Sequence, residues 1–280
     1  MKYLRGFAQL VEFEIRRFRW VMAALMLATA LLQLGWLAFL LRRETAYIRR
    51  MRLHRGDGGS FDDTFSLTDM LYEMRYWIAL SVLICAVVVA LYLLMIWYRD
   101  WFGKDAPIYR LLMLPQPRNL LYLAKGVAVL LAVFGLCSWQ LVLIVLDGVL
   151  YQTLVPADMR ETIEWRSVLR ANPVWTVVLP RRADQFAGSY AMGIVGVAAV
   201  FTAVLIERSV RGVRGLLGGI GYFAASALAV FVPLAFFSGY SPASPLYPEE
   251  WLAITFADAA AVLIVSLALG FRLLNKHIQV

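Results

Sequence analysis

Histidine and cysteine are nearly absent from this chain of 280 residues, which contains two of each. The histidines are His54 and His277, so no His-Glu-x-x-His zinc motif exists. Cys85 and Cys137 fall inside separate apolar runs, and we expect free, buried thiols. The sequence also lacks a GxxxxGK[ST] phosphate-binding loop and a Gly-x-Ser-x-Gly nucleophile elbow. No motif favours an enzyme, and we expect no catalytic, metal or cofactor site in this chain.

Charged residues are scarce as well. They make up 16% of the chain while hydrophobic residues make up 61%, which is too apolar for a soluble domain of this size. Six runs are long enough, at about 20 residues each, to cross a bilayer as helices. They lie near 21–41, 77–97, 127–146, 189–206, 216–237 and 251–269. The sequence therefore predicts an all-α, multi-pass membrane protein in which residues 1–280 form one domain with six transmembrane helices.

The segment before the first span has a helical pattern of its own. Its apolar residues recur at spacings of three and four: Leu4, Phe7, Val11, Ile15 and Phe18. Arginines and other polar residues follow the same period on another face. This pattern predicts an amphipathic helix within residues 1–20 that lies in the membrane interface. The alternative is a simple extension of the first span beyond the membrane.

The net charge of +8 indicates a topology. With the N-terminus inside, the inside segments carry 15 Lys/Arg against 5 Asp/Glu, and the outside segments carry 12 against 13. The positive-inside rule therefore favours both termini in the cytosol, although the arginines of residues 42–55 oppose it. We interpret the excess positive charge as contact with lipid headgroups and expect no nucleic-acid partner.

Two acids and four glycines in or beside the spans are candidate sites. Asp147, at the end of the third span, is either interfacial or part of a polar path. Asp258, about a third of the way into the last span, either forms a structural hydrogen bond between helices or lines a translocation path. Small residues in the fourth and fifth spans let helices approach closely, and we expect helix packing at these glycines: Gly193, Gly196, Gly215 and Gly219.

Capping residues predict helices outside the spans. Ser66 with Asp69 three residues later resembles a capping box, so the second helix should begin before its apolar run. Asp158 with Glu161 predicts the start of another helix, which Asn172 followed by proline would end.

A short amphipathic segment separates the second and third spans. Asp105 occupies a cap position, Pro107 fits the first helical turn, and Pro115 stops the helix. Only about two turns remain, and a helix this short is not stable alone in water. We therefore expect a cytosolic partner protein to dock on this segment.

The same segment carries a family resemblance. Leu111-Leu112-Met113-Leu114-Pro115-Gln116-Pro117-Arg118, followed by Lys125, resembles a motif after the second span of permease subunits of type 2, exporter-class ATP-binding cassette (ABC) transporters. The acidic-Gly-Thr that often precedes this motif is replaced by residues 104–107, Lys-Asp-Ala-Pro. The six predicted spans and the predicted N-terminal interfacial helix also match this family.

The resemblance implies a coupling helix that docks on a separate ATPase subunit, which binds ATP and Mg. The implied docking residues are Ile108, Arg110, Leu111, Leu112, Met113 and Pro115, with Arg118 and Lys125 as anchors beside acidic or headgroup partners. It further implies a second permease copy or homologue, a bacterial cell membrane, and a substrate such as an antibiotic, an antimicrobial peptide or a lipid-like molecule. Hydrolysis would occur outside this chain.

Two other functions remain open from the sequence. An ion-coupled secondary carrier would use Asp147 and Asp258, although the two halves of the chain show no convincing internal repeat. A membrane scaffold or sensor would use the same cytosolic segment to bind another partner.

Overall fold

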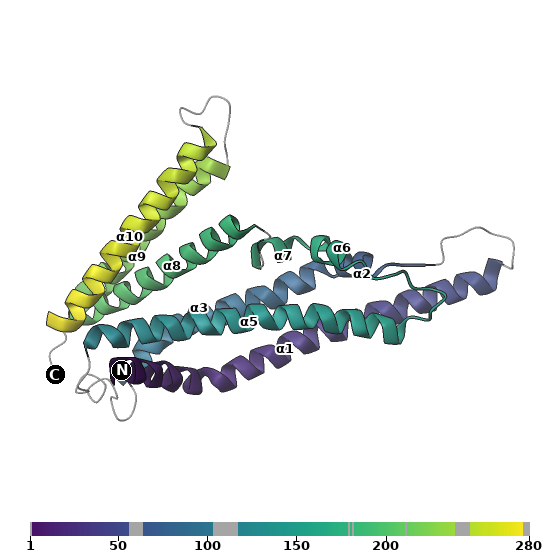
Figure 1. The fold of residues 1–280 in the computed structure, drawn as a ribbon, viewed down its shortest axis with the longest axis horizontal. Coiled ribbons are helices and arrows are strands. Elements are labelled where there is room, and N and C mark those ends of the chain that lie inside the picture. Colours follow the sequence, from purple (N-terminus) through teal and green to yellow (C-terminus); the bar gives the residue numbers. More distant parts are fainter. Residues whose placement is uncertain are drawn as a thin grey trace. The chain divides into compact units, whose positions relative to one another are not determined.

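The computed structural model describes residues 2–55, 64–102, 117–178, 180, 182–210, 212–238 and 247–276. Six long helices dominate this part of the chain: α1 (Lys2–Arg55), α3 (Arg75–Phe102), α5 (Arg118–Leu154), α8 (Ala183–Ser209), α9 (Val213–Ser238) and α10 (Pro248–Lys276). Each of these helices, drawn as a long coiled ribbon in Figure 1, contains one of the six apolar runs. Each is long and apolar enough to cross a membrane. Within the described residues, the predicted helical fold and the six helices that could span a membrane are confirmed.

Helix α1 is much longer than the apolar run inside it. Its 54 residues correspond to about 81 Å, whereas the hydrocarbon core of a bilayer is about 30 Å thick. Residues 2–20 are helical, as their periodicity predicts, but they belong to the same unbroken helix as the first span. Their placement in the membrane interface stays a prediction.

The chain divides into two compact units, which we describe separately. Unit 1 consists of residues 1–16, 89–131 and 187–280, and unit 2 consists of residues 17–88 and 132–186. Helices α1, α3 and α5 each contribute to both units.

Three short helices, α2 (Leu67–Glu73), α6 (Trp165–Ala171) and α7 (Pro173–Val178), belong to unit 2. They pack over an apolar cluster of unit 2 that is built from the long helices and the segments between them: Leu37, Leu40, Leu41, Ile48, Phe65, Leu67, Met70, Leu71, Met74, Ile78, Ile144, Tyr151, Val155, Met159, Val168 and Trp175. The short helices are thus held by burial of their apolar sides, because helices of six or seven residues are not stable alone.

One of the two capping predictions holds. Ser66 is the N-cap of α2, and its hydroxyl accepts a hydrogen bond from the Asp69 backbone N–H at 3.1 Å. The helix predicted to start at Asp158 instead starts at Trp165, so that start is wrong, although the end at Asn172 is right. Residues 155–164 instead contact the segment before α2, where the Phe65 N–H donates a hydrogen bond to the Met159 carbonyl at 3.2 Å.

In unit 1, α9 and α10 lie side by side as a hairpin (Figure 1). The link between α8 and α9 contains Gly212, whose φ of 78° lies in the left-handed region that favours glycine. Close packing follows this turn. A Cβ on Gly219 would lie 2.6 Å from the Ala203 carbonyl oxygen of α8, so only glycine fits there without a shift of backbone.

Candidate functional site

Three buried charged side chains from three helices meet in unit 1. Lys125 of α5 and Asp100 of α3 have no exposed surface, and Glu14 of α1 is 2% exposed. The Lys125 ammonium donates to Glu14 Oε1 at 2.7 Å, to Asp100 Oδ2 at 2.5 Å and to the Ile96 carbonyl at 3.1 Å. Arg99 Nη2 donates to the other oxygen of Glu14 at 3.0 Å. We call Glu14, Arg99, Asp100 and Lys125 the charge cluster.

The charge cluster is balanced and well bonded. Two cations face two anions, so the set carries no formal net charge. Lys125 has three N–H donors, and each has an acceptor within hydrogen-bond distance. Its ammonium also lies 5.2 Å from the centre of the Trp97 ring, a cation–π geometry. Buried charges are tolerated only when paired and hydrogen-bonded in this way, so the cluster fixes α1, α3 and α5 against each other.

The charge cluster lies next to both ends of the predicted docking segment. Helix α3 ends at Phe102, two residues after Asp100, and α5 begins at Arg118, seven residues or about two turns before Lys125. Residues 103–116 lie outside the described residues, and with them the predicted docking positions Ile108, Arg110, Leu111, Leu112, Met113 and Pro115.

The two predicted anchors are both engaged within the chain. Lys125 is fully buried and contacts acids of its own chain. Arg118 donates to the Leu274 carbonyl at 3.1 Å, in the last turn of α10. The last carbonyls of a helix have no partner inside it, so Arg118 satisfies one of them and ties the start of α5 to the end of α10.

A hydroxyl network extends from α5 through the other helices of unit 1. The Tyr122 hydroxyl donates to the Ala198 carbonyl at 3.0 Å and lies 3.3 Å from Thr202 Oγ1. Thr202 donates to the Ser266 carbonyl at 2.8 Å, and the Ser266 and Tyr222 hydroxyls are 2.7 Å apart. Because Tyr122 precedes Lys125 by three residues, this network connects α8, α9 and α10 to the helix that carries the cluster.

The two acids proposed for a translocation path lie in different units. Asp147, on α5 in unit 2, is 1% exposed, and neither carboxylate oxygen has a hydrogen-bond partner among the described residues. Asp258, on α10 in unit 1, is partly exposed.

The four glycines proposed for packing differ in their surroundings. A Cβ on Gly215 would lie 2.1 Å from the Val210 carbonyl oxygen, and Gly219 is equally confined against α8. Around Gly193 and Gly196 a Cβ would meet no heavy atom of the described residues within 4 Å. Close helix contact in unit 1 therefore involves Gly215 and Gly219 and does not involve the other two.

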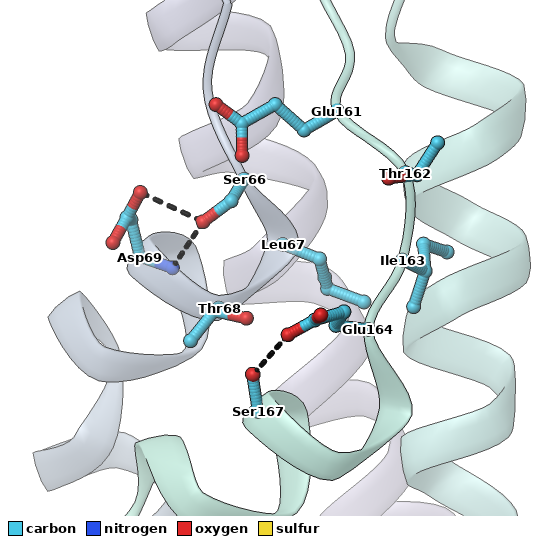
Figure 2. A pocket seen from close by; sticks show the side chains of 9 residues that line it. All are labelled: Ser66, Leu67, Thr68, Asp69, Glu161, Thr162, Ile163, Glu164 and Ser167. Carbon is cyan, nitrogen blue, oxygen red and sulfur yellow. Dashed lines mark hydrogen bonds between the residues drawn. The ribbon is translucent and has the colours of Figure 1, made fainter.

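Unit 2 contains an open pocket of about 340 Å³, shown in Figure 2. Acidic side chains that line the pocket accept hydrogen bonds from serine and threonine hydroxyls. Ser66 Oγ donates to Asp69 at 2.7 Å, and Ser167 Oγ donates to Glu164 at 2.6 Å (Figure 2). Glu161, at the rim, accepts from Thr64 at 3.2 Å. These contacts order the starts of α2 and α6, which accounts for the acids without a ligand.

Sequence reasoning missed Glu14 and Asp100, although a signal for both exists. Glu14 lies three residues after Val11 and four before Phe18, so it follows the apolar period of its helix. Asp100 likewise follows Trp97 by three residues. A charge at an apolar position of a helix indicates a buried pair. Comparison of the chain with protein-family models, curated proteins and solved structures gave no match.

Proposed function

We propose that this chain is the membrane-spanning permease subunit of an ABC exporter, and that a separate ATPase docks on residues 103–116. Six candidate membrane-spanning helices and the Leu-Leu-x-Leu-Pro motif between α3 and α5 support this proposal. The observation that carries it is the position of the charge cluster. Asp100 and Lys125 join the two helices that flank the docking segment, and Glu14 joins both to α1.

This geometry suits the transmission of movement from the docking segment to the membrane-spanning helices. A force on residues 103–116 acts on the end of α3 and the start of α5, which the Lys125–Asp100 pair holds together. The Glu14 carboxylate passes the displacement to α1, and Arg118 passes it to the end of α10. Lys125 and Arg118 therefore position the docking segment through their contacts within this chain. Leu111, Leu112 and Met113 contact the ATPase. Packed helices move as rigid bodies in such transitions.

The remaining partners follow from the same proposal. ATP and Mg bind to the ATPase subunits and not to this chain. A second permease copy or a homologue completes the path through a bacterial cell membrane, with both termini in the cytosol. The substrate is an antibiotic, an antimicrobial peptide or a lipid-like molecule.

The test is co-purification from the native membrane in mild detergent. The proposal expects an ABC ATPase to be retained by the chain and lost when Leu112→Glu places a charge in the docking face. Leu53→Glu is the matched control, because Leu53 is 80% exposed on α1 and outside the docking segment. Retention of the ATPase by Leu112→Glu, or purification of an active chain with no ATPase, would overturn the proposal.

Asp147 favours one second candidate, an ion-coupled carrier. An ionisable residue buried in a membrane-spanning helix without a partner is expensive to keep and is often functional. In proteoliposomes that contain only this chain, a carrier that uses Asp147 would show a proton flux that Asp147→Asn abolishes. The absence of such a flux in both proteins would exclude this candidate.

A further inference from the structure

Helix α1 continues for fourteen residues beyond its apolar run, which ends at Leu41. Residues 42–55 contain six arginines and one glutamate, the densest positive charge in the chain. We call this part of α1 the arginine arm.

One side of the arginine arm contacts other segments of unit 2. Ile48 is 6% exposed and belongs to the apolar cluster. Arg52 forms an ion pair with Asp158, and Arg43 Nη2 lies 2.7 Å from Glu73 Oε1. The arm therefore has a defined orientation within its unit, and its other side faces outward.

That outward side carries exposed arginines, of which Arg49 also acts electrostatically on Asp158 without forming an ion pair with it. Arg42, Arg49 and Arg50 are exposed, and none of them forms an ion pair with a residue that the structure describes. Arg42 and Arg49 are seven residues apart, so they lie on one face of the helix at about 10.5 Å from each other. Arg50 widens that face by one position.

The position of these arginines relative to the hydrocarbon core of the bilayer indicates what they bind. The 21 residues of the apolar run span about 31 Å, close to the thickness of the hydrocarbon core, so α1 needs no tilt to bury the run. Arg42 then lies at the edge of the hydrocarbon. Side chains on a helix lean toward its N-terminus, so Arg49 and Arg50 lean back toward the same edge. Arg49 and Arg50 thus lean toward the phosphate layer from the aqueous side, while the long side chain of Arg42 extends to it from the edge of the hydrocarbon.

We propose that the outward face of the arginine arm, formed by Arg42, Arg49 and Arg50, is a binding site for the phosphate groups of anionic lipids. The planar guanidinium group matches phosphate with two parallel hydrogen bonds. The site depends on α1 and on its contacts within unit 2, and it is independent of the ATPase.

The experiment measures lipid binding to the full chain in detergent by native mass spectrometry, with phosphatidylglycerol and phosphatidylcholine as competing probes. The wild-type chain retains phosphatidylglycerol preferentially, and added salt weakens the preference. Each arginine near an anionic surface contributes about five-fold, so Arg49→Gln with Arg50→Gln should lower the preference about 25-fold.

The matched control is Arg166→Gln with Arg170→Gln, which removes the same charge from exposed positions of α6 in the same unit. An equal loss of preference in this control would show a general charge effect and would overturn the proposal. Equal retention of the two lipids by the wild-type chain would also overturn it. A third arm adds short-chain polyphosphate, and displacement of phosphatidylglycerol at equal phosphate concentration would identify a soluble polyanion as the ligand and reject the lipid.

Discussion

Lys125 Nζ lies 2.5 Å from Asp100 Oδ2, and neither side chain is exposed. This contact joins α5 to α3 immediately beside residues 103–116. The same ammonium reaches Glu14 of α1 at 2.7 Å. One lysine thus connects three helices through interactions that have no competition from water.

Removal of the lysine should destabilise the protein strongly. Lys125→Met leaves Asp100 buried without its cation, and loss of one partner from a buried ion pair costs about 3–5 kcal/mol of unfolding free energy. The measurement is thermal unfolding in detergent, followed by tryptophan fluorescence. The double variant Lys125→Met with Asp100→Asn leaves Glu14 paired with Arg99 and should recover part of the loss. A single variant as stable as the wild-type chain would contradict the buried cluster.

The glycines of unit 1 offer a matched pair. Gly219→Ala places a Cβ 2.6 Å from the Ala203 backbone oxygen, so α8 and α9 must separate, at a cost of about 1–3 kcal/mol. Gly193→Ala enters open space and should be neutral or stabilising by up to about 1 kcal/mol, because alanine favours a helix more than glycine does. Both values come from unfolding in detergent. The same effect at both positions would show that α8 and α9 do not pack at Gly219.

The Tyr122 hydroxyl should contribute modestly to stability. Tyr122→Phe removes a buried hydrogen bond to the Ala198 carbonyl and should lower the unfolding free energy by about 1 kcal/mol. Tyr76→Phe is the control, since Tyr76 is 70% exposed. A larger effect from Tyr76→Phe than from Tyr122→Phe would count against the hydroxyl network.

Stability should depend on pH through Asp158 in unit 2. A hydrogen bond from Arg52 holds the pKa of the Asp158 carboxyl below its usual range. A carboxyl with a lowered pKa stabilises the fold above its unfolded value of about 3.9, and this stabilisation is lost as the pH falls through the lower folded value. The difference in unfolding midpoint between wild type and Asp158→Asn should therefore be constant from about pH 5 to 7 and shrink below about pH 4. A difference that persists undiminished to pH 3 would exclude this ion pair.

The spans were predictable because a 20-residue apolar run has few alternatives to a membrane helix. The lengths of the helices were not predictable, because an apolar run ends at the first charged residues while the helix can continue beyond them. At Leu41 the apolar run ends, yet α1 continues to Arg55 because Ile48 and Arg52 find partners in unit 2. Such contacts between distant segments leave no local trace in the sequence.

The charge cluster shows the limit of a local pattern. Lys125 was assigned from a motif, and its role as an external anchor could not be judged without knowing that Glu14 and Asp100 surround it. The sequence separates Glu14 from Lys125 by 111 positions. Asp158 was misjudged for the opposite reason. Its residue type and spacing favour a helix cap, but its carboxylate forms an ion pair with Arg52 and no helix starts there.

The neutrality of the charge cluster restricts how this protein can diverge. A lone change of Glu14, Asp100 or Lys125 to a neutral residue unbalances the formal charge of the cluster, whereas a paired change of a cation and an acid keeps it neutral. Related chains should therefore retain the three residues as a set, or replace a cation and an acid together. Covariation among these positions would be the evolutionary record of the contact.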